Sequence, residues 1–190
     1  MGMSGANKKV KGGLLEKEDC VLVVIDMQDK LVPRIHDNER TLNNIIKMIK
    51  FCRIAGIPVI WTEQKNLGNT VEAIVKELGD GARPIQKLVF DCLGSMEFME
   101  ELHALRKGSL LISGIETHIC VAQTALHAKK GYNVHVVADA VSSRSPDDRK
   151  AAMDRMTAAG VTVTTTEMAM FELLKEAGTD QFRAALPLLK

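Results

Sequence analysis

The sequence predicts an α/β protein with a three-layer α/β/α, Rossmann-like architecture, in which helices cover both faces of a six-stranded parallel sheet. Two observations predict this fold. Six short apolar runs alternate with segments whose apolar residues recur at helical spacing, the order typical of repeated strand–helix–strand units. The first run, residues 20–26, is almost entirely apolar, as expected for a strand buried on both faces. Right-handed crossovers between such strands give a doubly wound sheet.

The first half of the chain contains three of the expected strands. After the first strand, Leu42, Ile45 and Ile49 share one helical face, and Gly56 marks the end of that helix. The expected elements here are the strand 20–26, the helix 41–55, the strand 58–63, the helix 71–78, the strand 84–90 and the helix 96–105.

The second half continues the alternation. Ser145 and Pro146 supply an N-cap and a first-turn proline for a helix that Gly160 ends. The expected elements here are the strand 109–115, the helix 117–130, the strand 133–139, the helix 146–159, the strand 161–165 and two closing helices near 167–177 and 179–189.

Length and charge fit one ordinary domain. The chain has 190 residues, 46% of them hydrophobic, which is enough to bury a core. A net charge of +1 gives no electrostatic argument for binding nucleic acid or an anionic membrane. Lys8, Lys9 and Lys11 lie among small residues. We therefore expect a flexible N-terminal tail over residues 1–18 and a single domain over residues 19–190.

The sequence predicts a cytoplasmic protein with reduced thiols. No apolar run approaches the ~20 residues that a membrane helix needs, and the N-terminus lacks the apolar region of a secretory signal. Cys20, Cys52, Cys92 and Cys120 are far apart and form no C-x-x-C pair. This spacing is not that of a disulfide framework or a zinc site.

Three reactive side chains are expected at one edge of the sheet. In open α/β sheets, ligands bind beyond the carboxyl ends of the strands. Asp26 ends the first strand, Lys87 lies near the end of the third, and Cys120 follows the fourth at the start of a helix. If the fold is as predicted, these three side chains lie close together.

The three residues together have a coherent chemistry. A helix N-terminus and the Lys87 ammonium are both expected to lower the pKa of Cys120 and favour the nucleophilic thiolate. Asp26 then transfers the proton, and the tight turn SGIETHIC supplies amides for an oxyanion. Taken singly, a helix-capping Asp, a surface Lys and a small buried Cys explain the same residues, and composition and spacing leave those structural roles open.

Four segments resemble one known family, the isochorismatase-like cysteine hydrolases. VLVVIDMQ (21–28) is similar to the family's first-strand motif, and GIETHICV (114–121) resembles its nucleophile turn. DAVSSRS (139–145) and TEMAMFELL (166–174) also resemble the family. The resemblance covers about residues 20–175, and the first two motifs together are highly specific.

The resemblance implies a strand order and a set of roles. The order is 3-2-1-4-5-6. Asp26 is implied as the general acid/base, Lys87 as the cation that supports the thiolate, and Cys120 as the nucleophile. The resemblance also implies a cis peptide between Ile115 and Glu116, with the backbone amides of Glu116 and Cys120 as the oxyanion hole.

The sequence departs from the metal-dependent members of this family. Nicotinamidases carry an Asp-x-His metal motif after the second strand, where this chain reads WTEQKNLGNT without a histidine. We therefore expect no catalytic metal and no cofactor. The residues TEQ (62–64) and LG (67–68) instead resemble the isochorismatase domain-containing subgroup.

Four further residues are candidates for the substrate pocket. Gln28 lies two residues after Asp26, and Gln64 and Phe90 follow the second and third strands. His118 lies inside the nucleophile turn. Structural alternatives stay open for three of them: a turn role for Gln28, a core position for Phe90 and a surface or interface position for His118.

The leading hypothesis is hydrolysis of an amide-like C–N bond in a small molecule by a cysteine nucleophile. One alternative is vinyl-ether cleavage of the isochorismate type, which needs an acid and does not strictly need a thiol. Another is a non-catalytic oligomeric scaffold. The methionine-rich helices near the C-terminus, and the family's habit of assembling, lead us to expect a homo-oligomer.

Overall fold

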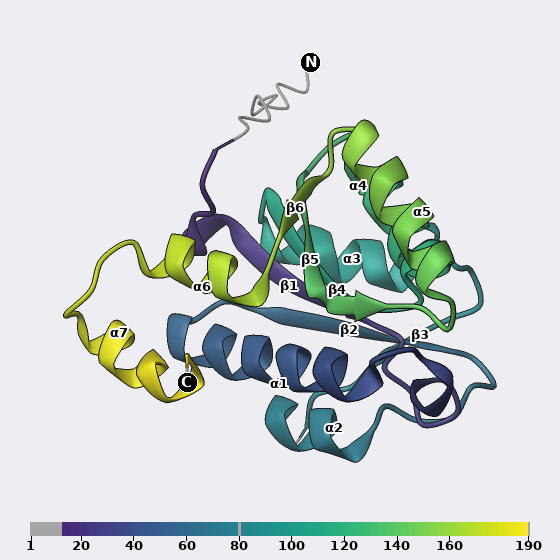
Figure 1. Ribbon diagram of the computed structural model, residues 1–190, viewed down its shortest axis with the longest axis horizontal. Helices are drawn as coiled ribbons and strands as arrows, with labels where there is room; N and C mark the ends of the chain where they lie inside the picture. Colours follow the sequence, from purple (N-terminus) through teal and green to yellow (C-terminus); the bar gives the residue numbers. More distant parts are fainter. Residues whose placement is uncertain (1–12, 80, 190) are drawn as a thin grey trace.

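The computed structural model describes residues 13–79 and 81–189 and contains a six-stranded parallel sheet. The strand order is β3-β2-β1-β4-β5-β6, which confirms the expected topology (Figure 1). The strands are β1 Cys20–Ile25, β2 Val59–Gln64, β3 Ile85–Lys87, β4 Ser109–Ile115, β5 Asn133–Ser142 and β6 Thr162–Thr164.

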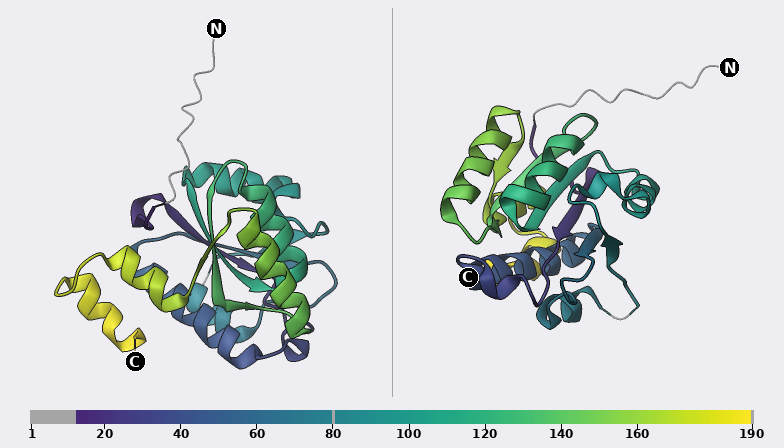
Figure 2. Two further views of the ribbon diagram at one scale, coloured as in Figure 1. Left: turned by 45° about the horizontal axis from the view of Figure 1, so that its top comes forward. Right: turned by 90° about the vertical axis from the view of Figure 1, so that its right-hand side faces the viewer.

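Helices cover both faces of the sheet and give the expected three layers (Figures 1 and 2). One layer contains α1 Asn38–Ala55, α2 Glu72–Leu78, α6 Thr166–Leu174 and α7 Asp180–Ala185. The other contains α3 Met96–Leu105, α4 Ala122–Ala128 and α5 Pro146–Ala158.

The position of β1 in the middle of the sheet explains why its residues are all apolar and do not alternate with polar ones. Leu22 and Val24 pack into the core beneath α1, whereas Val21 and Val23 pack into the core beneath α3, α4 and α5. Because side chains alternate across a strand, both sets are buried at once. Each such side chain contributes about 1.5–3 kcal/mol through burial. The residue that follows β1 is therefore carried by a strand that is buried along its whole length.

Several element boundaries differ from the sequence prediction. The third strand was expected over residues 84–90, but β3 ends at Lys87, and Leu88, Val89 and Phe90 are exposed. An edge strand has a partner on one side only, and its sequence pattern does not fix where pairing stops. The expected helix 117–130 begins with a π-helical turn at Thr117–Val121.

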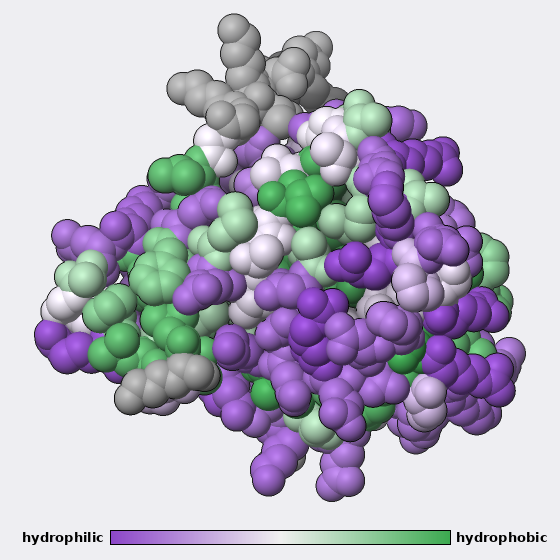
Figure 3. Space-filling model, viewed as in Figure 1, coloured by the Kyte–Doolittle hydropathy of each residue, from purple (hydrophilic) through white to green (hydrophobic). Residues whose placement is uncertain are grey.

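The N-terminal segment joins the fold before β1. Leu15 is buried in the core, and its N–H donates a hydrogen bond to the Glu172 carboxylate (3.1 Å). Most of the expected tail, residues 1–12, lies outside the described residues. Within the described residues, no helix combines the length and apolar character needed to cross a bilayer. Hydrophilic side chains cover the face over α1 and α2, and apolar side chains gather over α6 and α7 (Figure 3).

Candidate active site

Asp26 lies directly after β1, at the carboxyl edge of the sheet. It has a left-handed backbone conformation (φ +51°), which Asp tolerates better than most residues. Its side chain is buried and accepts hydrogen bonds from Thr62 Oγ1 (2.7 Å) and Lys87 Nζ (2.6 Å). Both carboxylate oxygens therefore have a donor, which offsets the cost of burying the charge.

Lys87, the last residue of β3, links the acid to the thiol. Its Nζ lies 2.6 Å from Asp26 Oδ2, 2.8 Å from Gln64 Oε1 and 3.7 Å from Cys120 Sγ. Burial lowers the pKa of Lys87, but the negative charge of Asp26 and its hydrogen bond with the Lys87 amine outweigh this effect, so the pKa is raised overall. The residue is therefore an ammonium ion at neutral pH.

Cys120 lies in the π-helical turn Thr117–Val121 that precedes α4. The sequence predicted a lowered pKa for this thiol, and that prediction is wrong. Burial, followed by the charge of Asp26, raises the pKa of Cys120, and the opposing effect of Lys87 is smaller. At neutral pH the sulfur is therefore a thiol.

The turn before Cys120 depends on a close approach to β1. Gly114 has φ +112°, and a Cβ at this position would lie 2.1 Å from the carbonyl oxygen of Ile25. Only glycine fits this contact. The peptide bond between Ile115 and Glu116 is cis. Glu116 and Cys120 both line a cavity, described below. The family resemblance implied that their backbone amides form an oxyanion hole there.

A second ion pair holds the other side of this turn. The Glu116 carboxylate accepts hydrogen bonds from the Arg144 backbone N–H (2.9 Å) and from its Nε (3.2 Å) and Nη2 (2.9 Å). Next to it, His118 Nδ1 contacts Ser143 Oγ at 2.9 Å. The segment after β5 thus holds the turn that carries Cys120 through two neighbouring contacts.

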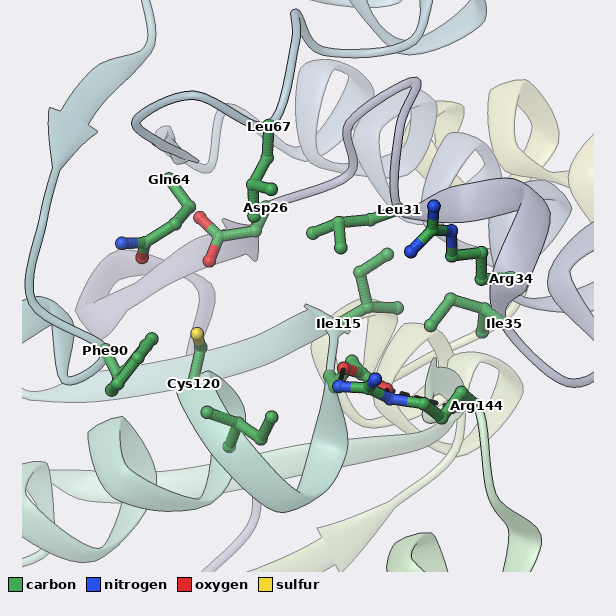
Figure 4. Close-up of a pocket in the computed structure, with 12 residues that line it drawn as sticks. Asp26, Leu31, Arg34, Ile35, Gln64, Leu67, Phe90, Ile115, Cys120 and Arg144 are labelled. Carbon is green, nitrogen blue, oxygen red and sulfur yellow. Dashed lines mark hydrogen bonds and ion pairs between the residues drawn. The ribbon is translucent and has the colours of Figure 1, made fainter.

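A cavity of about 370 Å³ opens above Cys120 (Figure 4). It brings together six of the residues expected at the site: Asp26, Gln64, Phe90, Ile115, Glu116 and Cys120. Lys87 lies behind this surface, in contact with Asp26. Sequence reasoning did not identify Leu31, Arg34, Ile35, Leu67, Ile119 and Arg144. Arg144 could have been found from the sequence, because it lies in the family-like segment DAVSSRS. Arg34 could not, because it lies in a connecting turn without a motif.

The structure does not place Gln28 or His118 among the residues that line this cavity. Gln28 is fully buried, and its amide donates to the carbonyl oxygens of Gln64 (3.0 Å) and Gly68 (2.8 Å) and accepts from the Gln64 N–H (2.9 Å). The Gln28 side chain therefore fixes the loop after β2. His118 faces Ser143 and Asp148 instead.

No metal cluster is evident in the described part of the chain: no group of three or more His, Cys, Asp or Glu side chains is placed to hold an ion. Cys92 is fully buried, and burial raises its pKa to about 11. Of the four cysteines, which all lie within the described residues, Cys120 alone borders the cavity.

The fold and the site define an α/β protein of the hydrolase type, with an acid, an ammonium and a thiol at the base of an apolar cavity. The chain belongs to the isochorismatase family. The sequence profile of the Isochorismatase domain matches residues 20–168. Isochorismatase family protein 1A from Dictyostelium discoideum is 38% identical over 184 residues, which cover 93% of this chain and 88% of that protein.

Solved structures share the fold. The MAR1 ribonuclease from Caenorhabditis elegans superimposes with a TM-score of 0.87 at 32% identity and covers 93% of this chain and 92% of its own. The YcaC gene product from Escherichia coli, described as an octameric hydrolase of unknown specificity, gives a TM-score of 0.82 at 26% identity, with coverages of 93% and 87%.

Proposed function

We propose that this protein hydrolyses an amide-like C–N bond in a small molecule, with Cys120 as nucleophile, Asp26 as general acid/base and Lys87 as the cation that balances their charges. One observation carries the proposal. Lys87 Nζ lies 2.6 Å from the acid and 3.7 Å from the sulfur at the base of a cavity. Buried charges converging on a thiol in a cavity are typical of an active site.

In the first half of the reaction, Cys120 Sγ attacks the carbonyl carbon while its proton passes to the Asp26 carboxylate. Because the pKa of Cys120 is raised, proton transfer accompanies attack and does not precede it. The carbonyl oxygen becomes negatively charged at the turn formed by Glu116 and Cys120, where backbone amides stabilise it. Asp26 then protonates the leaving nitrogen, the C–N bond breaks, and a thioester remains on Cys120.

In the second half, Asp26 accepts a proton from water, and the oxygen of that water attacks the thioester carbonyl. The C–S bond breaks, and the proton on Asp26 returns to the sulfur. Lys87 stays protonated throughout, which the raised pKa of its amine supports. Its positive charge forms an ion pair with the Asp26 carboxylate at 2.6 Å.

A screen of small amides and ureides tests the proposal, with Cys120→Ala and Cys92→Ala as a matched pair. Cys120→Ala is expected to lower kcat/KM by at least ~10³, the scale seen when a covalent nucleophile is removed. Cys92→Ala removes a buried thiol outside the cavity and is expected to retain most of the activity.

Two outcomes would contradict this mechanism. If Cys120→Ala remained active while Asp26→Ala were inactive, acid-driven cleavage of the vinyl-ether kind would replace the thiol mechanism. If neither Cys120→Ala nor Asp26→Ala changed the turnover of any active substrate, Cys120 and Asp26 would have no catalytic role.

Because the C. elegans relative is called a ribonuclease, RNA must also be tested as a substrate in the same screen. The net charge of +1 and the mainly apolar cavity walls favour a small molecule. We therefore expect no Cys120-dependent cleavage of a labelled single-stranded RNA.

We also propose that the protein works as a homo-oligomer. The E. coli relative is octameric. In this chain, Leu88, Val89 and Phe90 are exposed where the edge strand β3 ends, and Phe90 also borders the cavity. Apolar side chains at a sheet edge favour contact with a second copy.

A further inference from the structure

The charges around the cavity do not balance. Its charged lining residues are Asp26, Glu116, Arg34 and Arg144. Asp26 pairs with Lys87 at 2.6 Å, and Glu116 pairs with Arg144 at 2.9 Å. Across the part of the chain that the structure describes, the Arg34 side chain has no hydrogen bond or ion pair. The cavity therefore carries one uncompensated positive charge.

The turn that carries Arg34 is fixed in place. The backbone N–H groups of Leu31 and Val32 both donate to the carbonyl oxygen of Gln28, at 3.0 and 2.9 Å. Ile35, which follows Arg34, is buried. In Figure 4 the guanidinium of Arg34 extends toward Leu31, across the cavity from Cys120. A preformed turn thus presents a free cation to the cavity.

The other arginine at the cavity is already occupied. The guanidinium of Arg144 donates from Nε and Nη2 to Glu116, and its backbone N–H donates to the same carboxylate. Removing those donors would leave the buried Glu116 charge without a partner, which is costly. Arg34 is therefore the cation available to a ligand.

The walls between Arg34 and Cys120 are apolar. Leu31, Ile35, Leu67 and Ile119 line the cavity. A ligand that fills this space loses water, and charge interactions strengthen when water is excluded. A guanidinium also matches a carboxylate with two parallel hydrogen bonds.

We propose that Arg34 is a specificity residue that binds a carboxylate of the substrate. The substrate class is then a small carbonyl compound with a short apolar body and one anionic end, placed with the carbonyl at Cys120 and the carboxylate at Arg34. The position of the reacting carbonyl rests on the proposed function; the anion site rests on the charge of the cavity.

A binding experiment tests the anion site without any reaction. The probes are 4-methylpentanoate and 4-methylpentanamide, which have the same shape and differ in charge. We expect the isotopically labelled protein to bind the carboxylate about five- to tenfold more tightly than the amide in NMR titrations at low salt. The backbone signals of Ile115 and Ile119 should shift, because both residues line the cavity.

Variants identify the source of this preference. Arg34→Gln is expected to remove the preference and leave amide binding unchanged, and Arg34→Lys is expected to retain part of it. Arg40→Gln is the matched control, since Arg40 is exposed, pairs with Asp37 and lies outside the cavity. It should behave like the wild type.

The inference is overturned if the carboxylate fails to bind the wild-type cavity or if Arg34→Gln keeps the preference. Cys120→Ser separates this result from the proposed function. The carboxylate preference should persist in that variant. The binding result therefore tests the anion site independently of whether Cys120 is the nucleophile.

Discussion

Asp26 controls the reactivity of the thiol in two opposite ways. In the proposed mechanism Asp26 is the base that accepts the Cys120 proton during attack, but its buried negative charge raises the pKa of Cys120 before attack. Lys87 favours the thiolate, and its effect is smaller. The thiol is therefore weakly reactive at neutral pH, and under the proposed mechanism it becomes reactive only when Asp26 accepts its proton during attack.

The first prediction follows from this balance. Asp26→Asn removes the charge that raises the pKa of Cys120, so we expect alkylation of Cys120 by iodoacetamide at pH 7.5 to become about tenfold faster. Hydrolysis is expected to fall by ~10² or more, because the proton acceptor is lost. Mass spectrometry of the labelled peptide measures the first effect.

Thr62→Val is the control, because it removes the 2.7 Å hydrogen bond to Asp26 and keeps the carboxylate charge. The pKa of Cys120 is raised above the ordinary cysteine value of 9.0, so its thiolate forms only at higher pH. The alkylation rate of the wild type should therefore keep rising above pH 9. Slower alkylation in Asp26→Asn, or a wild-type plateau near neutral pH, would contradict this account.

The second prediction concerns stability. Lys87→Met leaves the buried Asp26 charge without its cation, so the free energy of unfolding should fall by about 3–5 kcal/mol. The double variant with Asp26→Asn should recover part of this loss. Urea unfolding followed by the fluorescence of Trp61, the single tryptophan, measures both.

Lys65→Met provides the comparison for Lys87→Met, because Lys65 is exposed and should tolerate the change. If Lys87→Met unfolded at the wild-type urea concentration, the ion pair would not contribute to stability. A double variant no more stable than Lys87→Met would equally argue against an uncompensated charge.

The sequence predicts the positions of some site residues and not of others. Asp26, Lys87 and Cys120 were predictable because each lies at the end of a recognisable element. Arg34 was not, because its importance depends on which charges across the cavity are already paired. Gln28 was ambiguous for a similar reason, since its amide donates to Gln64 at the end of β2 and to Gly68 in the following loop, 36 and 40 residues away in sequence.

At the scale of elements, β1 and β4 lie so close together at Gly114 that the space between them cannot hold a Cβ atom. Gly114 lies against Ile25, the residue before Asp26. This contact sets the spacing between the strand that carries the acid and the turn that carries the thiol. A small shift here would separate the reacting groups.

The third prediction tests this contact. Gly114→Ala would place a Cβ 2.1 Å from Ile25 O and 2.5 Å from Ile25 N, so we expect a loss of more than about 2 kcal/mol in the free energy of unfolding. Gly56→Ala also has a positive φ, at +71°, but its Cβ would meet no atom within 4 Å. It should cost about 1–2 kcal/mol. Equal losses would show that the contact with β1 does not matter.

The sequence predicts central elements better than peripheral ones. β1 and β4 are buried on both faces, so their apolar runs match their boundaries closely. β3 is an edge strand of three residues, and the apolar residues after it are exposed. Apolar content cannot distinguish a core position from an exposed one that another surface covers.

At the scale of the whole molecule, assembly is the fourth prediction. Light scattering at micromolar concentration should give a mass that is a multiple of the monomer mass. Leu88→Asp places a charge in the exposed edge beside β3 and should lower that mass. Val75→Asp, which changes an exposed apolar side chain on α2, is the control and should not. A monomer mass for the wild type would refute the homo-oligomer.

The groups proposed for catalysis and those proposed for substrate recognition lie on different parts of the molecule. Asp26 and Lys87 are carried by strands of the sheet, whereas Arg34 and Leu67 extend from surface loops that hydrogen bonds of Gln28 tie to the scaffold. Natural variation in those two loops can therefore retarget such an enzyme to a new compound while the bond-breaking groups stay unchanged. Exchanging the loops between relatives is a direct route to altered selectivity on a common catalytic base.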